Sequence, residues 1–138
     1  MSRTSHAALS IIVLTVAVVA GCSKTDAVEA PPAPVMTANW KVTSDVSFPP
    51  AEVERIAGQL GGDMIALRNT AYEVDGKRVQ INTLLAADAA SADAIMIAMR
   101  KLKPDDFLVR QELVIYEFVV KNEAIAEARA GKAHIEAM

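Results

Sequence analysis

The residue types that could do chemistry are few in this chain, and its single cysteine, Cys22, is the most informative of them. The cysteine follows a largely apolar run over residues 7–20, and two small residues, Ala20 and Gly21, stand directly before it. One cysteine excludes an intramolecular disulfide, and it excludes any zinc site built from several thiolates. The sulfur of Cys22 therefore needs another role.

No other set of residues has the spacing of a catalytic or metal site. His134 is the only histidine after residue 22, and no partner at fixed spacing accompanies it. Asp105 and Asp106 directly follow a proline, where paired carboxylates usually serve a turn. The pair Gly61-Gly62 precedes a predicted strand and lacks the lysine of a phosphate-binding loop. We therefore predict a protein that is not an enzyme and holds no metal or other cofactor.

The charge balance argues against nucleic acid as a partner. The formal net charge is −3, from 14 Lys and Arg against 17 Asp and Glu. Without residues 1–21, which contain one charged residue, Arg3, it becomes −4. A binder of phosphate backbones needs a basic patch. The one cluster of cations, at Arg100, Lys101 and Lys103, lies in the last turn of a predicted helix. There it complements the helix dipole, although an anion site is the alternative.

Residues 1–22 resemble the signal segment of bacterial lipoproteins. A short polar start with one cation, Arg3, leads into the apolar run over 7–20, which is shorter than the ~20 residues that span a bilayer. Val19-Ala20-Gly21-Cys22 then resembles the lipobox, with Val19 where leucine is more frequent. The alternative is an uncleaved membrane helix in which Cys22 has no special chemistry.

The resemblance implies that diacylglycerol is transferred to the Cys22 sulfur and that the chain is cleaved between Gly21 and Cys22. Further acylation, for example with palmitate, would hold the protein firmly in the membrane, because a single acyl chain gives only marginal binding. Ser23, rather than aspartate, after the cysteine favours the outer membrane, with the protein facing the periplasm.

Residues 22–39 are predicted to be an acylated cysteine followed by a tether. The stretch contains Pro31, Pro32 and Pro34 and few large apolar residues, so it cannot bury enough surface to order itself. In polyproline geometry its reach is on the order of 50 Å, at ~3.1 Å per residue. The alternative is that the prolines form a docking ligand for a groove on another protein.

Residues 40–138 are predicted to form one α+β domain. Alternation of apolar and polar residues predicts a strand over 40–48, and 3.6-residue periodicity predicts a helix that starts at Pro49-Pro50 and stops at Gly61-Gly62. Asp75-Gly76 predicts a type I′ hairpin turn, which places Val74 opposite Lys77, Tyr72 opposite Val79, Thr70 opposite Ile81 and Ala66 opposite Leu85. A second helix is then predicted, capped by Asp88 or Ser91 and running to about Lys103. It is followed by a short extended piece at 107–109, a strand over 113–120, and a helix over 123–130 capped by Asn122.

This order of elements predicts a ferredoxin-like sandwich, βαββαβ with an added C-terminal helix, in which the helices lie on one face of an antiparallel sheet. In that arrangement the first and third strands are central, and the last strand is an edge. Leu113, Ile115 and Val119 would then form an outward apolar strip, covered by the final helix or by another subunit.

Two classes of function follow. The first is a non-enzymatic envelope lipoprotein whose domain docks onto another envelope protein or onto its own copy. Its candidate interaction face consists of Lys41, Thr43, Asp45, Gln80, Asn82, Leu113, Ile115 and Glu117. The second is a small-ligand-binding or inhibitor domain with a pocket near Trp40, Tyr72 and Tyr116, although such aromatics more often belong to the core.

Overall fold

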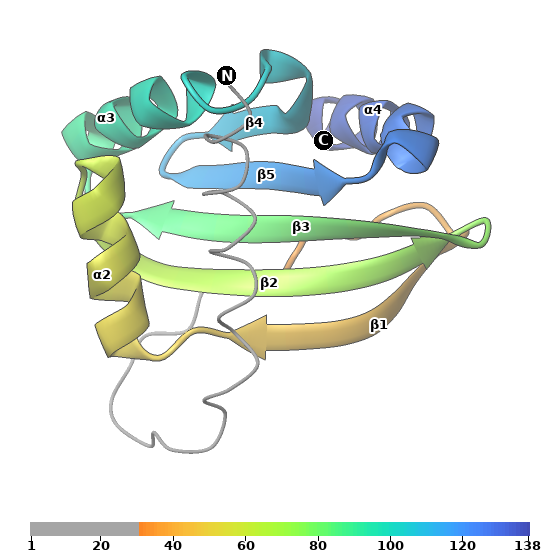
Figure 1. Ribbon diagram of the computed structural model, residues 1–138, viewed down its shortest axis with the longest axis horizontal. Helices are drawn as coiled ribbons and strands as arrows, with labels where there is room; N and C mark the ends of the chain where they lie inside the picture. The colour runs from red at the N-terminus through yellow and green to blue at the C-terminus, as the bar shows by residue number, and fades with distance from the viewer. Residues whose placement is uncertain (1–30) are drawn as a thin grey trace.

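A computed structural model describes residues 31–138, which form a five-stranded antiparallel sheet with three α-helices (Figure 1). The predicted α+β class is therefore confirmed. The strand order across the sheet is β1-β2-β3-β5-β4. In chain order the elements are β1 (Trp40–Ser47), α2 (Pro50–Leu60), β2 (Met64–Val74), β3 (Lys77–Ala86), α3 (Ala89–Arg100), β4 (Leu108–Gln111), β5 (Val114–Val120) and α4 (Ile125–Glu136), with short 3₁₀ turns at Asp105–Phe107 and Asn122–Ala124.

The hairpin between β2 and β3 is the sheet's longest pairing, and its register is as predicted. Asp75 and Gly76 form the turn with φ values of 52° and 82°. Two successive positive φ angles are the signature of a type I′ turn. The predicted cross-strand pairs are all present: Val74 with Lys77, Tyr72 with Val79, Thr70 with Ile81 and Ala66 with Leu85.

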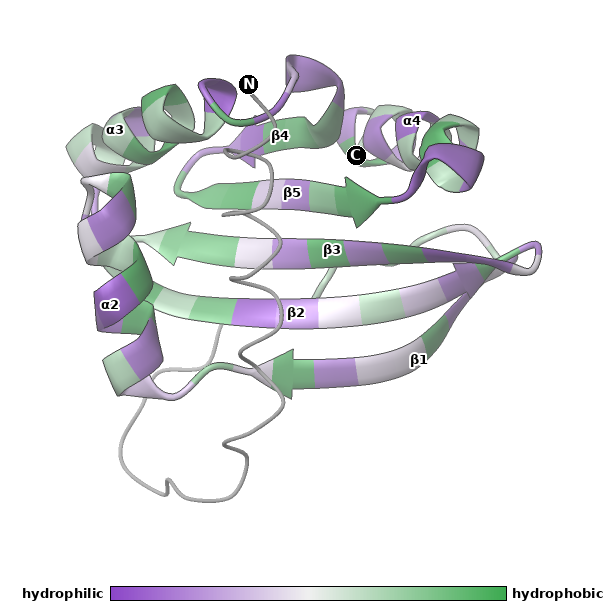
Figure 2. Ribbon diagram, in the orientation of Figure 1, coloured by the Kyte–Doolittle hydropathy of each residue, from purple (hydrophilic) through white to green (hydrophobic). Residues whose placement is uncertain are grey.

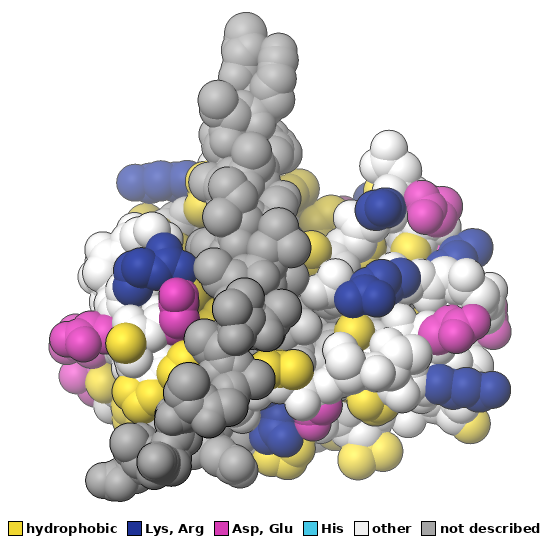
Figure 3. All heavy atoms as spheres, turned by 60° about the horizontal axis from the view of Figure 1, so that its bottom comes forward, with side chains coloured by type: hydrophobic (Ala, Val, Ile, Leu, Met, Phe, Trp, Pro, Cys, Tyr) yellow, Lys and Arg dark blue, Asp and Glu magenta, His cyan; other side chains and the backbone are white. Residues whose placement is uncertain are grey.

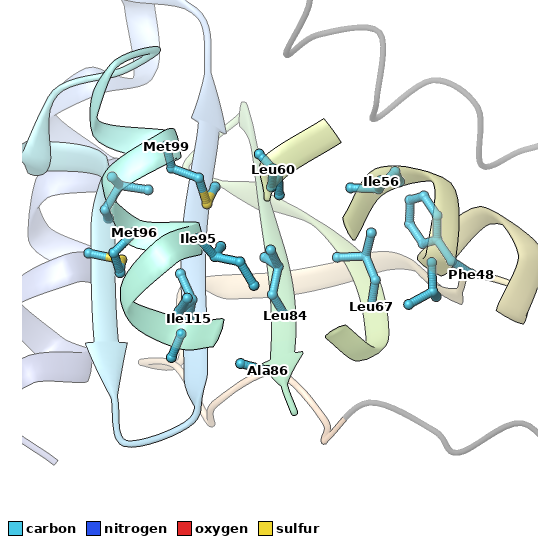
Figure 4. Packing of buried hydrophobic residues seen from close by; sticks show 13 residues of the cluster. Phe48, Ile56, Leu60, Leu67, Leu84, Ala86, Ile95, Met96, Met99 and Ile115 are labelled. Atoms are coloured by element: carbon cyan, nitrogen blue, oxygen red, sulfur yellow. The ribbon is translucent and has the colours of Figure 1, made fainter. Parts of the chain in front are cut away.

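Helices α2 and α3 pack together over one end of one sheet face (Figure 4). The apolar residues of α2 that recur at the predicted helical spacing are buried: Val53, Ile56, Ala57 and Leu60. The C-cap of α2 is Gly61, whose left-handed φ of 83° is easily reached only without a side chain. The cluster under the two helices includes Ile56, Leu60, Leu67, Leu84, Ile95, Met99 and Ile115. Ile115 is fully buried there, so the prediction that it points outward was wrong.

Helix α4 lies on the opposite face of the sheet. Its residues Ala128 and Ile135 belong to a second cluster with Ile81 and Phe118. Ile81 and Leu84 are three positions apart on β3, so their side chains point to opposite faces. Helices α2 and α3 therefore share one face, and α4 covers the face that they leave open, which was one of the two predicted alternatives. It packs on the Phe118 side of β5, however, and not on the predicted strip with Ile115.

The ferredoxin-like strand order is not found. The first strand was predicted to be central, but β1 is an edge strand, and within residues 31–138 its only pairing is the antiparallel one with β2. The physical reason is the course of α2, which runs across the ends of the strands in Figure 1 instead of along them. The chain therefore enters β2 at the same end of the sheet at which it left β1, and β2 runs antiparallel beside β1. Polar residues along β1 suit such an edge position.

A β-bulge divides β1 between the two faces. The pairing with β2 shifts between Val42 and Ser44. As a result Trp40 packs into the α4 cluster, whereas Val46 packs against the α2 and α3 cluster. The strict alternation in the sequence predicted that both side chains share one face. A bulge inserts one unpaired residue and reverses the facing of everything after it.

Helix α4 is longer than predicted and has a different start. The chain forms a 3₁₀ turn at Asn122–Ala124 and the helix begins at Ile125, with no side-chain cap hydrogen bond at Ala124. The helix also continues through Gly131, where it was expected to stop. A Cβ atom at Gly131 would lie 2.7 Å from two carbons of the Trp40 indole, so the glycine serves close packing and not helix termination.

Candidate functional site

A cleft of about 840 Å³ opens where the end of α2 meets the start of α3, at one end of the sheet. It is more than twice as large as the hollow of about 370 Å³ between β4 and α4. Small residues dominate its helical walls. The lining consists of Pro50, Val53, Glu54, Ala57, Gly58, Gly61, Gly62, Asp63, Met64, Ile65, Asp88, Ala90, Ser91 and Ala94.

The loop after α2 is fixed against the first turn of α3, which forms the back of the cleft. A Cβ at Gly62 would lie 2.6 Å from the Ser91 carbonyl oxygen, so no larger residue fits without movement. The backbone N–H of Asp63 donates to the Ser91 hydroxyl at 3.1 Å, and the N–H of Ala87 donates to the Asp63 carbonyl at 3.0 Å. These contacts give the cleft a defined shape.

Asp88 caps α3, as one of the two predicted candidates. Its carboxylate accepts a hydrogen bond from the Ser91 N–H at 2.8 Å. This backbone hydrogen bond, supported by the Ser91 side chain, lowers the pKa of Asp88 below its usual value. The carboxylate therefore keeps its negative charge at the mouth of the cleft at neutral and mildly acidic pH.

The charge lining the cleft is entirely negative. Glu54, Asp63 and Asp88 come from three different segments, and no lysine or arginine is among the lining residues. Glu54 and Asp63 form no salt bridge with any other residue in the part of the chain that the structure describes. The side chain of Ile65 lines the same cleft and is 43% exposed. The arrangement can bind a ligand that is both cationic and apolar.

Sequence analysis missed this cleft. Glu54 was not singled out as a site residue, and Gly61-Gly62 was interpreted only as a helix stop. The signal that could have found it is the pair of small-residue runs at 57–62 and 87–94, each at a predicted helix end. Small residues at two helix ends leave a hollow where those ends meet.

The predicted interaction face is divided by the structure. Its three residues on β1, Lys41, Thr43 and Asp45, are exposed at the edge of the sheet. The Asp45 carboxylate accepts a hydrogen bond from Arg68 at 2.8 Å, and this bond holds the pKa of Asp45 below its usual value. β1 therefore presents a polar, partly paired edge.

The other five residues do not form a surface with these three. Gln80 and Leu113 are half-buried, while Asn82, Ile115 and Glu117 are 2%, 0% and 2% exposed. The prediction that the last three face outward was wrong, because α3 covers Ile115 and because Asn82 and Glu117 are buried in a polar chain of their own.

That polar chain crosses the middle of the sheet, where Figure 2 shows hydrophilic segments of β2, β3 and β5 side by side. The Asn69 amide donates to the Asn82 oxygen at 2.7 Å, and the Asn82 amide donates to Glu117 at 2.9 Å. The Lys103 ammonium lies 3.1 Å from the second oxygen of Glu117. Sequence analysis placed Asn82 and Glu117 on an exposed interaction face. The alternating pattern contains no signal that separates an exposed polar face from a buried polar chain.

The three aromatic residues proposed to line a pocket belong to the core around α4. The Trp40 ring meets the Tyr72 ring edge to face, with centroids 5.2 Å apart, and Tyr72 is 3% exposed. Tyr116 belongs to the same cluster. A hollow of about 310 Å³ does lie beside Trp40 and Tyr72, but residues 32–36 form its other wall.

His134 lies in α4 and not in a tail. Its Nε2 lies 2.8 Å from the Val35 carbonyl oxygen and can donate to it. Ala33 and Met36 pack against the α4 cluster, so the last part of the predicted tether contacts the domain. Between residues 31 and 138, no group of three or more His, Cys, Asp or Glu side chains is arranged to hold a metal ion.

The predicted lipid attachment at Cys22 and the cleavage site after Gly21 lie outside the described residues. None of the helices within 31–138 combines the length and the hydropathy that crossing a bilayer requires. On the face shown in Figure 3, basic, acidic and apolar side chains are interspersed, with no broad basic patch.

The comparisons with known proteins found no relative: no family model, no curated protein and no solved structure matches the chain.

Proposed function

We propose that the protein is a lipid-anchored lipoprotein of the bacterial envelope whose α+β domain binds a protein partner in the cleft between α2 and α3. The attachment rests on the sequence, where Val19-Ala20-Gly21-Cys22 ends an apolar run. The binding role rests on one observation, the exposed apolar side chain of Ile65 in a cleft of about 840 Å³. An apolar floor under polar groups is the usual composition of a binding site.

The location that fits these features best is the outer membrane, with the domain in the periplasm. Ser23 follows the lipid-bearing cysteine. The net charge of −4 after residue 21, from 13 Lys and Arg against 17 Asp and Glu, disfavours adhesion of the domain to anionic lipid or nucleic acid. The domain would then meet a partner instead of lying on the lipid surface.

We propose a non-enzymatic role because no histidine, cysteine or lysine lines the cleft. The Ser91 hydroxyl does lie beside the Asp88 carboxylate, but that carboxylate caps α3 and has a lowered pKa, which makes it a weak base. Activation of a hydroxyl nucleophile needs an effective base next to it.

The second candidate is a small-ligand-binding domain. The observation that favours it is again the cleft volume, which lies within the ~300–1,000 Å³ typical of small-molecule sites. The two candidates differ in the size of the occupant, so one variant can test both.

The membrane attachment is tested by Cys22→Ala in the native cells. We expect the wild-type protein in the membrane fraction, with a mass that shows loss of residues 1–21 and gain of acyl chains. Cys22→Ala should lose both features. An unchanged mass and an unchanged membrane fraction would contradict the lipoprotein proposal.

The cleft is tested by Gly58→Trp, because a Cβ at Gly58 meets no atom within 4 Å and the indole would fill the cleft. Crosslinking of intact cells should give fewer protein adducts for Gly58→Trp than for the wild type. The matched variant Gly58→Ala should give as many adducts as the wild type. The small-ligand candidate predicts a different result: no protein adduct, and a thermal stabilisation by envelope extract that Gly58→Trp abolishes.

A further inference from the structure

The cleft brings together three carboxylates, from Glu54, Asp63 and Asp88, with no cation among its lining residues. Elsewhere several carboxylates have a cation close by, such as Asp45 with Arg68 at 2.8 Å and Glu127 with Lys77 at 3.0 Å. Glu54 and Asp63 have no such partner among residues 31–138. Like charges gathered without counter-charges cost stability, and a cationic partner relieves that cost.

The apolar part of the cleft continues along α3. Ala90 and Ala94 line it, and Ile97 follows one turn later, 56% exposed. Positions 90, 94 and 97 have the spacing i, i+4, i+7, so they share one side of the helix. The result is a stripe of apolar surface that leads out of the acidic cleft, longer than a small cation can cover.

From these features we infer that the occupant of the cleft is a segment of a protein partner that carries basic and apolar side chains together. This inference rests on the proposed function. Lysine or arginine would lie near Glu54, Asp63 and Asp88, and apolar side chains would pack on Ile65 and toward Ile97. Acidic or phosphorylated segments and anionic lipids are disfavoured by the same three carboxylates.

The segment meets a site that is already formed. Gly62 permits the close contact between the loop and Ser91, and the Asp63 and Ser91 groups are hydrogen-bonded to each other. Little backbone ordering is therefore needed in this domain on binding, which lowers the entropic cost of association.

The experiment uses the full-length protein in its native cells, with the photo-crosslinking residue benzoylphenylalanine in place of Ile97. Ile97 is exposed and is not among the residues that line the cleft, so the probe does not fill the cleft as Gly58→Trp would. Glu73, which is exposed and lies outside the lining of the cleft, is the matched control position. Crosslinked peptides are sequenced by mass spectrometry. We expect an adduct from position 97, absent from position 73, in which the attached segment contains lysine or arginine among apolar residues.

Reversing the charge of the cleft's acidic residues tests whether they bind a basic segment. Glu54→Lys with Asp63→Lys should reduce the position 97 adduct roughly tenfold, whereas Glu73→Lys with Glu123→Lys, an equal change of net charge at exposed sites, should leave it unchanged. In isolated membranes, raising salt from roughly 0.05 to 0.5 M should weaken the wild-type adduct in the same way. Thermal melting of each variant shows whether the fold is retained.

Each outcome decides a claim. An adduct at position 97 that survives charge reversal, or that joins a neutral or acidic segment, overturns the inference and leaves the proposed binding function standing. No protein adduct at position 97 in a variant that melts like the wild type overturns both.

Discussion

The Lys103 ammonium lies 3.1 Å from the Glu117 carboxylate and donates a hydrogen bond of 2.8 Å to the Phe118 carbonyl oxygen. The two side chains are only 13% and 3% exposed. The pair ties the loop after α3 to β5. It also terminates the polar chain from Asn69 through Asn82, so that the buried carboxylate has a charged partner at one oxygen and an amide at the other.

Removing one member of this pair should destabilise the domain strongly. Glu117→Ala leaves the Lys103 charge and the Asn82 amide without their partner, and we expect a loss of about 3 kcal/mol in the free energy of unfolding. Urea denaturation of the purified mature protein measures it. The double variant Glu117→Leu with Lys103→Met should lose less than the sum of its single changes, because it leaves no buried charge.

The exposed pair of Arg55 and Glu52, 43% and 25% exposed, is the control. Glu52→Gln should cost less than about 1 kcal/mol. Equal losses for Glu52→Gln and Glu117→Ala would show that Glu117 is solvated in solution and that the polar chain is not a buried structure.

Gly131 is predicted to be intolerant of even a methyl group. In Gly131→Ala the added carbon would stand 2.7 Å from the Trp40 ring, and overpacking of this kind costs typically 1–3 kcal/mol. Thermal unfolding should show a lower Tm, and the fluorescence of Trp40, the only tryptophan, should report the moved ring.

Gly58→Ala is the matched change in the other direction. Gly58 lies inside α2 with open space around it, and alanine is favoured over glycine in a helix by about 1 kcal/mol. A higher Tm for Gly58→Ala and a lower one for Gly131→Ala are expected. The same sign for both would contradict the packing at Gly131.

The sequence predicted elements far better than it predicted their arrangement. Local chemistry fixes the start of α2 at Pro50, the turn at Gly76 and the cap at Asp88, and each depends on residues close in the chain. The position of β1 depends on the course of a whole helix. The two halves of β1 pack on opposite faces of the sheet because of one bulge between Val42 and Ser44, and an alternating sequence pattern does not reveal such a bulge.

The candidate site shows the same limit. Glu54 and Asp63 lie in and just after α2, but Asp88 follows 25 residues later, and only the meeting of α2 with α3 brings all three to one cleft. Asn82 and Glu117 are polar residues on alternating strands, which is also how a solvated face looks. Burial of such residues is decided by their mutual hydrogen bonds, and those form only once β3 and β5 pair.

Stability should fall at alkaline pH because of Tyr72. Burial raises the pKa of Tyr72 from 10.0 to about 12, which means that the folded state holds the phenol proton more tightly than the unfolded chain. This contribution is fully present below pH 10 and is lost as the pH rises from 10 toward 12. Urea titrations across this range measure the loss.

Tyr72→Phe removes the titrating group and keeps the ring. Its stability should change less with pH above 10 than that of the wild type, with Tyr116 accounting for part of the remaining loss because burial raises its pKa as well. Identical alkaline profiles for Tyr72→Phe and the wild type would contradict a buried phenol at this position.

The end of the predicted tether should behave as part of the domain. Ala33 and Met36 pack against the α4 cluster and the Val35 carbonyl oxygen lies 2.8 Å from His134 Nε2. With the lipid on Cys22 that we propose, these contacts leave only residues 23–32 as a spacer, with a reach of about 31 Å in polyproline geometry instead of roughly 50 Å. Amide hydrogen exchange of residues 35–39 should therefore be at least about tenfold slower than in the variant Met36→Ser with His134→Ala, which removes both contacts. The variant should leave exchange in β2 and β3 unchanged, since it removes no contact within the hairpin. Equally fast exchange of residues 35–39 in both proteins would restore the longer tether that the prolines alone predict.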